Sequence, residues 1–263
     1  MKLDLLTEDI LIDRIDFFIR YFFRKGQKAV IGVSGGKDSS VCLTLLTRAL
    51  GKYRVVPVII PNGEMKDITD ALEICKWNGF EKNEVLVINI EDAYKSIVGQ
   101  LRGSVINDVF ATNTPARLRM TVLYGVAALV NGFVCNTCNR SEDYVGYSTK
   151  YGDSCGDFSL LNNLTVTQVV KLADYLNIPI ELGHKTPDDG MSGVSDETKL
   201  GFTYAELDKF LTDGVKGPNY ERIKALHENP NTKLKLLPMY NPFGAVLSET
   251  TIEEEEFDYQ YFA

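Results

Sequence analysis

This sequence of 263 residues has little histidine and little basic charge. Its two histidines, His184 and His227, leave little material for a multi-histidine zinc site or a Ser-His-Asp triad. Its 28 lysines and arginines are outnumbered by 36 aspartates and glutamates, which gives a net charge of −8. Nucleic-acid binding depends on clustered basic side chains, so we expect no nucleic-acid partner.

Long hydrophobic runs are also lacking. No stretch approaches the ~18 consecutive apolar residues that suggest a membrane span. The N-terminus carries Asp4, Glu8 and Asp9 and lacks the basic-then-apolar pattern of a secretion signal. Five cysteines are an odd number, and without such a signal a disulfide framework is not expected. These features predict a cytoplasmic protein that does not contact membranes.

No internal repeat and no clear linker divides the chain, so we expect a single domain over residues 1–263. Within the N-terminal region 1–26, residues 8–25 have the spacing of an amphipathic helix capped by Thr7. Its wide aromatic stripe fits core packing or a subunit interface equally well. The acidic tail, residues 250–263, contains four consecutive glutamates and is expected to be solvated.

The apolar pattern alternates between strands and helices, which predicts an α/β fold: a doubly wound, Rossmann-like parallel sheet with helices on both faces. Strands are expected in the segments 30–33, 54–60, 85–90 and 133–136. Helices are expected at 66–78, 92–98, 113–130, 165–177, 202–212 and 219–227. Ligands of such sheets bind beyond the carboxyl ends of the strands, so the loops after these strands should converge on one crevice.

A glycine-rich turn follows the first of these strands, with the sequence Ser34-Gly35-Gly36-Lys37-Asp38-Ser39. A strand, a tight turn and a helix N-terminus together aim backbone N–H groups at one point, where an anion fits. Asp38 would repel a bare phosphate, which suggests a Mg²⁺ ion bridging carboxylate and phosphates. The spacing fits neither the Walker A loop nor the dinucleotide fingerprint. The alternative is a glycine-rich turn with capping side chains only.

Four further stretches combine polar and charged residues: 113–120, 136–142 at the end of the fourth strand, 148–157, and 185–190 with 195–201. In the first, Asn113 is expected to cap a helix with Pro115 in its first turn. Arg117 and Arg119 are two positions apart and point to different sides, so one can face a ligand while the other makes a structural ion pair. In the second stretch, Glu142 could join Asp38 as a hard oxygen ligand for Mg²⁺.

The glycine-rich turn resembles the pyrophosphate loop of the N-type ATP pyrophosphatases, which share the adenine nucleotide alpha hydrolase-like fold. Together with the four further stretches, from about residue 31 to 204, it resembles the ammonia-dependent NAD synthetases. The resemblance implies a ligase that amidates deamido-NAD to NAD with ATP and ammonia. The reaction would pass through an adenylated carboxylate and release AMP and pyrophosphate. A glutamine-using nitrilase-like domain is not evident in the sequence, so free ammonia is the expected nitrogen source.

The resemblance also implies roles for individual residues. Residues expected to bind ATP are Gly32, Val33, Ser34, Gly35, Gly36, Lys37, Asp38, Ser39 and Thr137. Mg²⁺ would be held by Asp38 and Glu142. Deamido-NAD would be contacted by Arg117, Lys150, Asp157 and Lys233. Catalytic roles fall to Asp38, Lys37 and Asp157, with Asp153 as a second candidate to take a proton from ammonia. Lys37 could either add charge near the leaving group or point to solvent.

The resemblance further implies a homodimer in which Arg117, Lys150 and Asp157 reach into the partner's site. Three positions depart from the family pattern. A lysine that contacts ATP in some members falls at Val166, a threonine contact falls near Asp188, and a His-Lys pair aligns with Thr232-Lys233. The metal and phosphate residues match the family.

Two other functions remain open from sequence. A tRNA sulfur-transferase of the same superfamily would use a Cys-x-x-Cys pair, and Cys135 and Cys138 have that spacing. The acidic composition and the expected burial of Cys135 on a strand argue against it. The other possibility is a non-catalytic module that holds ATP or AMP, and the presence of both candidate metal carboxylates disfavours it.

Overall fold

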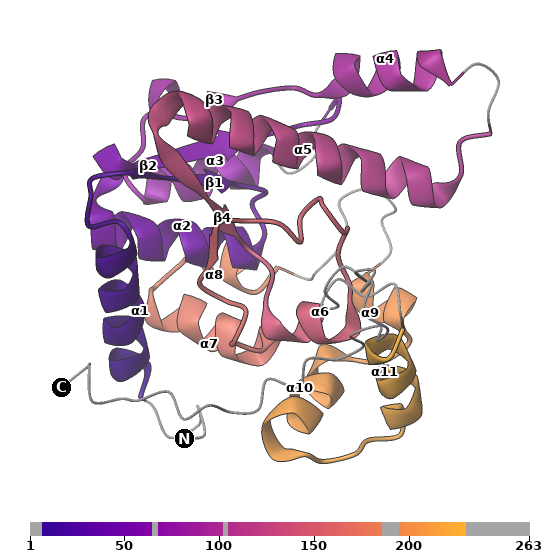
Figure 1. The fold of residues 1–263 in the computed structure, drawn as a ribbon. Coiled ribbons are helices and arrows are strands. Elements are labelled where there is room, and N and C mark those ends of the chain that lie inside the picture. The colour runs from indigo at the N-terminus through magenta and orange to yellow at the C-terminus, as the bar shows by residue number, and fades with distance from the viewer. Residues whose placement is uncertain (1–6, 65–67, 102–104, 186–194, 230–263) are drawn as a thin grey trace, which may run out of the picture.

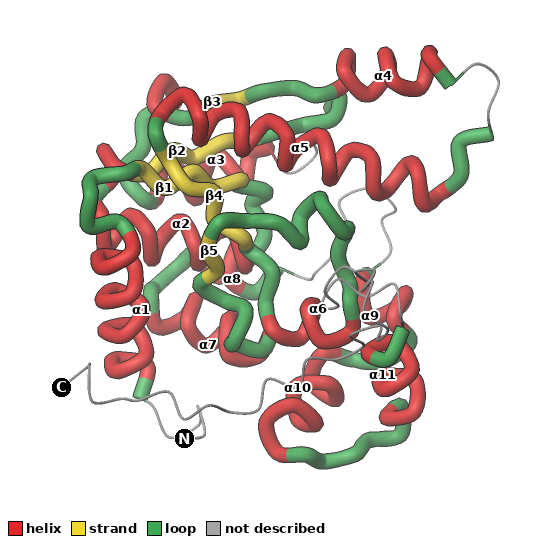
Figure 2. Tube along the Cα trace, in the orientation of Figure 1, coloured by secondary structure: helices red, strands yellow, loops and turns green. Residues whose placement is uncertain are grey.

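Five parallel strands form the centre of the fold (Figure 2). The structure is a computed structural model that describes residues 7–64, 68–101, 105–185 and 195–229. The strands are β1 (Lys28–Gly32), β2 (Val55–Ile59), β3 (Leu86–Val87), β4 (Gly132–Asn136) and β5 (Phe158–Ser159). Their order is β3-β2-β1-β4-β5, and every pairing is parallel. The predicted parallel sheet is confirmed, and β5 is a short strand within a segment that the sequence pattern left irregular.

Helices cover both faces of the sheet, as predicted (Figure 1). One face packs on α1 (Glu8–Phe22), α2 (Lys37–Leu50), α3 (Ile68–Trp77), α7 (Val166–Tyr175) and α8 (Ile180–Gly183). The other face packs on α5 (Asp108–Val130), beside which lies α4 (Glu91–Gln100). Alternation along β1 explains this division: Ala29 and Ile31 belong to the first core, and Val30 to the second.

A third, smaller apolar cluster lies beyond the carboxyl ends of β1 and β4 (Figure 1). It joins α6 (Arg140–Val145), α9 (Asp196–Leu200), α10 (Tyr204–Asp213) and α11 (Tyr220–His227) around the buried Leu207. Two short 3-10 helices, Lys52–Arg54 and Lys82–Glu84, precede β2 and β3. The N-cap of α6, Asn139, lies next to Asp38 in the first turn of α2, so the start of α6 faces the turn after β1.

The N-terminal helix α1 uses its apolar stripe for core packing. Thr7 caps the helix as predicted, since its hydroxyl oxygen accepts a hydrogen bond from a first-turn N–H at 3.5 Å. The buried side chains are Ile12, Ile15 and Ile19. On the outer side Phe17 and Tyr21 are 62% and 55% exposed. A subunit interface on that outer side stays a prediction.

The long helix α5 begins earlier than the sequence indicated. Its cap is Asn107, which accepts a hydrogen bond from the N–H of Phe110 at 2.9 Å, and Pro115 lies inside the helix. The prediction of a cap at Asn113 was wrong because a proline costs an established helix one backbone hydrogen bond without always ending it. Asn113 instead accepts a hydrogen bond from the Thr149 hydroxyl at 2.9 Å.

Some expectations lie outside the described residues. These are the contacts near Asp188, the Thr232-Lys233 pair and the acidic tail at 250–263. In the ranges that are described, no helix is long and apolar enough to cross a membrane.

Candidate active site

The candidate site lies where the sheet order reverses. Strands β1 and β4 are neighbours, while the chain runs from β1 outward through β2 and β3 before it returns to β4. The helix after β1, α2, packs on one face of the sheet, and the helix before β4, α5, packs on the other. A reversal of strand order of this kind opens a crevice at the carboxyl ends of the two neighbouring strands. The turn after β1 leads to Asp38, and the turn after β4 leads to Asn139. The side-chain amide of Asn139 donates a hydrogen bond to Oδ1 of Asp38 at 3.0 Å, which joins the two turns.

Gly35 shapes the turn after β1. Its φ is +81°, and a Cβ there would lie 2.7 Å from the backbone nitrogen of Ala71 in α3. Only glycine meets both requirements without strain. The hydroxyls of Ser34 and Ser39 lie 3.1 Å apart, and the N–H of Gly36 donates to the Ser34 hydroxyl at 3.3 Å. The turn is therefore tight and polar, in keeping with a phosphate cradle at the start of the 14-residue helix α2.

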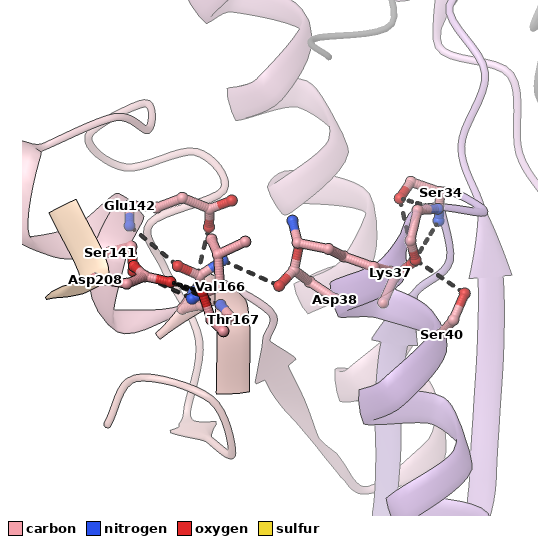
Figure 3. A network of polar contacts seen from close by, with 12 residues as sticks. Ser34, Lys37, Asp38, Ser40, Ser141, Glu142, Val166, Thr167 and Asp208 are labelled. Atoms are coloured by element: carbon pink, nitrogen blue, oxygen red, sulfur yellow. Dashed lines mark hydrogen bonds and ion pairs between the residues drawn. The ribbon is translucent and has the colours of Figure 1, made fainter. Parts of the chain in front are cut away.

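Lys37 and Asp38 form an ion pair at the first turn of α2, with 2.8 Å between Nζ and Oδ2. Their side chains are 4% and 18% exposed, so the expectation that Lys37 could point to solvent was wrong (Figure 3). Burial alone would lower the pKa of Lys37. The carboxylates of Asp38 and Glu142 outweigh it and raise that pKa above its ordinary value. The site therefore holds a fixed positive charge among acidic groups.

Asn139 is a central residue of the site that sequence reasoning missed. It is fully buried, and its backbone N–H donates to Oε2 of Glu142 at 3.2 Å while its side-chain amide donates to Asp38. Its Oδ1 also accepts from the N–H of Glu142 at 3.1 Å, which completes a capping box at the start of α6. Asn139 thus ties the two predicted metal carboxylates together. The Asn-x-x-Glu spacing was the signal that could have identified it.

A third carboxylate, Asp196, stands near this group and was also missed. It is 5% exposed and accepts a hydrogen bond from the Tyr147 hydroxyl at 2.9 Å. Its charge helps to raise the pKa of Lys37. Burial, and then the charges of Glu142 and Asp196, hold the pKa of Tyr204 far above its usual range, so this phenol stays neutral.

Arg117 and Lys150 are brought together beside α5. Arg117 Nε donates to the backbone carbonyl of Lys150 at 3.2 Å, and the Lys150 ammonium lies 5.3 Å from the centroid of the Tyr151 ring. Arg119 points to another side, as predicted. Its partner, however, is a backbone carbonyl and not a carboxylate, because Nε donates to Ile60 O at 2.9 Å. Burial lowers the pKa of Arg119.

Asp157 is placed against β4, just before β5. Its Oδ2 accepts a hydrogen bond from the N–H of Val134 at 2.7 Å, and it contributes, after burial, to the raised pKa of Tyr124. Asp153 caps its own loop by accepting from the N–H of Thr149 at 2.8 Å. Both carboxylates therefore hold the loop after β4 in place, on the side of α5.

Thr137 follows β4 directly and is half-buried, next to the two cysteines of the Cys-x-x-Cys spacing. Cys135 and Cys138 are 3% and 5% exposed. Burial also raises the pKa of the neighbouring Cys42 thiol. Cysteine thiols enclosed in this way are poor nucleophiles. Among the described residues, no three His, Cys, Asp or Glu side chains form a group that could hold a metal by themselves.

Comparisons with known proteins identify relatives of this chain. A family model described as NAD synthase matches residues 11–240. The NH(3)-dependent NAD(+) synthetase of Thermoplasma acidophilum is 36% identical over 234 residues, which cover 86% of this chain and 95% of that protein. That of Methanocaldococcus jannaschii is 35% identical and covers 86% of this chain and 88% of that protein.

Two solved structures are similar over most of their length. An NMN synthetase from Francisella tularensis has a TM-score of 0.81 and 32% identity, covering 90% of this chain and 99% of that one. An NH3-dependent NAD synthetase from Campylobacter jejuni has a TM-score of 0.72 and 25% identity, covering 90% of this chain and 100% of that one.

Proposed function

Because the chain belongs to the NAD synthase family, we propose that it is an ammonia-dependent NAD synthetase, a ligase that amidates deamido-NAD with ATP and ammonia. The observation that carries this proposal is the junction at the sheet reversal, where Asn139 joins Asp38 to Glu142 beside the Gly35 turn. The family match argues against the sulfur-transferase alternative, and so do the enclosed thiols of Cys135 and Cys138.

The chemical problem is to make a carboxylate reactive towards ammonia. In the proposed reaction the carboxylate of deamido-NAD attacks the α-phosphorus of ATP, and pyrophosphate leaves. Backbone N–H groups of the Gly35–Gly36 turn, the Ser34 and Ser39 hydroxyls and the Lys37 ammonium would stabilise the charge on the leaving group. Ammonia then attacks the acyl adenylate, AMP leaves, and a carboxylate takes the extra proton. Asp157 and Asp153 remain the candidates for that proton.

The acidic donors of the site fit a magnesium ion. Asp38 and Glu142 supply carboxylate oxygens, the ligand type that Mg²⁺ prefers, and Asn139 fixes both side chains. The carboxylates of Asp38, Glu142 and Asp196 act together on this site and raise the pKa of Lys37, so the site favours positive charge. A magnesium ion bound there with ATP would neutralise charge on the phosphates.

Similarity to one solved structure suggests nicotinate mononucleotide as a second candidate substrate. The structure with the higher TM-score of the two reported is an NMN synthetase, whose name implies amidation of the mononucleotide and not of the dinucleotide. The chemistry at the carboxylate would be the same for both substrates. The two functions differ in whether the adenylate half of deamido-NAD contributes binding energy.

A turnover assay tests the function. Purified protein with Mg-ATP and ammonium should form amide, AMP and pyrophosphate in equal amounts from deamido-NAD, and nicotinate mononucleotide should react with a lower kcat/KM. Glutamine in place of ammonium should give little product. Preference for the mononucleotide would establish the second function. Pyrophosphate without amide would indicate another acceptor, and absence of pyrophosphate would contradict both proposals.

We further propose a homodimer in which Arg117, Lys150 and Asp157 serve the partner's site. In support, Arg117 of α5 bonds to the backbone of Lys150, and Asp157 lies near Tyr124 of α5, so all three gather beside this helix. The exposed aromatic side of α1 offers one candidate interface surface, with Phe17 and Tyr21 exposed.

Mixing two inactive variants tests the shared site. Arg117→Ala and Asp38→Ala should each be inactive alone. After unfolding and refolding together in equal amounts, half of the dimers are mixed, and each mixed dimer has one site without either change. We therefore expect about a quarter of the native activity to return. If Arg117 serves its own subunit, both sites of the mixed dimer stay defective and no activity returns.

A further inference from the structure

A buried carboxylate on α10 connects three helices near the candidate site. Asp208 is 4% exposed, and its Oδ1 accepts a hydrogen bond from the Ser141 hydroxyl of α6. Its Oδ2 accepts from the backbone N–H of Thr167 at 2.7 Å and from the Thr167 hydroxyl at 2.6 Å, both in α7. Three donors thus meet one carboxylate that is almost excluded from water (Figure 3).

The same contacts give hydrogen-bond acceptors to the free backbone N–H groups in the first turn of α7. Its first N–H, that of Val166, donates to the Ser141 hydroxyl oxygen at 3.1 Å, and the next, that of Thr167, donates to Asp208. The Ser141 hydroxyl therefore accepts from α7 and donates to α10 at once. Ser141 itself is fully buried, so this group has one arrangement in which every hydrogen bond is made.

This group also fixes the first turn of α6. Ser141 lies between Asn139, which caps α6, and Glu142, whose side chain closes the capping box. The backbone N–H of Arg140 donates to the Leu164 carbonyl at 2.8 Å, which adds a second tie between this turn and the segment before α7. The direction in which Glu142 leaves the helix thus depends on where Ser141 is held.

We propose that Asp208 is a positioning residue: by holding Ser141 it fixes the first turn of α6 and so keeps Glu142 aligned with Asp38. This inference rests on the proposed metal site of these two carboxylates. Burying a carboxylate costs free energy unless its hydrogen bonds are all made, and an apolar side chain would fill the same space more cheaply. A buried charge that holds one arrangement of three helices is instead suited to alignment.

Manganese binding tests the proposal without turnover. Mn²⁺ replaces Mg²⁺ and is titrated by electron paramagnetic resonance into the full chain with ATP, in the absence of ammonia and of the nicotinate substrate. Ser141→Ala and Asp208→Asn should each raise the Kd for Mn²⁺ about tenfold, the lower end of the effect of outer residues around a metal. The double variant should be no weaker than the single ones, because both changes disturb the same contact.

The matched control is Thr212→Val. The Thr212 hydroxyl donates to the backbone carbonyl of Asp208 at 3.0 Å, so this change disturbs α10 at the same residue but leaves the carboxylate contacts in place. It should leave the Kd unchanged. Glu142→Gln serves as the positive control for the metal site itself. Circular dichroism selects variants that fold, and Ser141→Ala, which removes one atom, keeps the test available if Asp208→Asn does not fold.

The outcomes distinguish the positioning role of Asp208 from the existence of the metal site. Weaker binding in Ser141→Ala and Asp208→Asn with native binding in Thr212→Val supports the positioning role. Native binding in the first two, or equal weakening in Thr212→Val, overturns it. If Glu142→Gln binds Mn²⁺ as tightly as the native chain, the metal site is wrong and the inference falls with it.

Discussion

Asp38→Ala is expected to lower kcat/KM for amide formation by about 10³-fold, the size of effect found when a group that stabilises developing charge is removed. Asp38 lies where the two turns of the sheet reversal meet, and its two oxygens hold Lys37 and Asn139. The change therefore removes a proposed metal ligand and also releases the two side chains on either side. Steady-state kinetics at saturating magnesium measures the effect.

The same change should destabilise the fold, and this must be separated from catalysis. Asp38→Ala leaves the Lys37 ammonium, 4% exposed, without its closest carboxylate. Breaking a buried pair in this way costs about 3–5 kcal/mol, while replacing both partners with apolar groups is often neutral. The double variant Lys37→Met with Asp38→Ala should therefore recover much of the free energy of unfolding in urea, yet remain inactive.

Comparing Asp38→Ala with the double variant shows whether Asp38 serves catalysis or only neutralises Lys37. If the double variant regains both stability and activity, Asp38 is needed only to neutralise Lys37, and its proposed role at the phosphates is wrong. If neither variant loses stability, the buried ion pair contributes less than the geometry indicates. Loss of activity in both, with stability lost only in Asp38→Ala, is the expected result.

Local sequence signals predicted the parts of the site that lie next to a strand end. The turn from Ser34 to Ser39 could be located because glycines, hydroxyls and a helix start follow one another directly. The parallel sheet and the covering of both its faces were predicted for the same reason, since alternating patterns of strands and helices are local. The apolar stripe of α1 revealed its buried side only in part, since Ile15 and Ile19 are buried while Ile10 and Phe18 are 43% and 41% exposed.

Contacts of the candidate site between residues far apart in the chain could not be predicted from the sequence. Asp208 is 67 residues from Ser141 along the chain, and Asn139 is 101 residues from Asp38. Neither pairing leaves a periodic pattern, because each depends on how separate helices pack. The predicted start of α5 was wrong for a related reason: Pro115 carries a strong local signal for a helix start, and packing of the helix on the sheet outweighs it.

Gly35→Ala is expected to abolish ATP binding, and a second glycine allows the cause to be isolated. At Gly35 an alanine would adopt φ near +81° and would place its Cβ 2.7 Å from the nitrogen of Ala71 and 2.8 Å from Cβ of Asp70. Gly26 has a nearly equal φ of +82°, with nothing within 4 Å of the added Cβ. Gly26→Ala therefore carries the backbone strain alone.

Comparing Gly26→Ala with Gly35→Ala distinguishes the backbone strain of a positive φ from the steric contact between the added Cβ and α3. Gly26→Ala should lower the free energy of unfolding by about 1–2 kcal/mol, the cost of a left-handed conformation for a residue with a Cβ. It should leave the Kd for ATP unchanged by calorimetry. Gly35→Ala should cost more stability and weaken ATP binding at least about 100-fold, because the turn can relieve the contact with α3 only by moving its N–H groups away from the phosphates.

Equal loss of stability in the two variants, with ATP binding intact in Gly35→Ala, would mean that the contact with Ala71 does not shape the cradle. The turn would then owe its form to the strand and helix that flank it, and the phosphates would have to be held by side chains such as Ser34, Lys37 and Ser39.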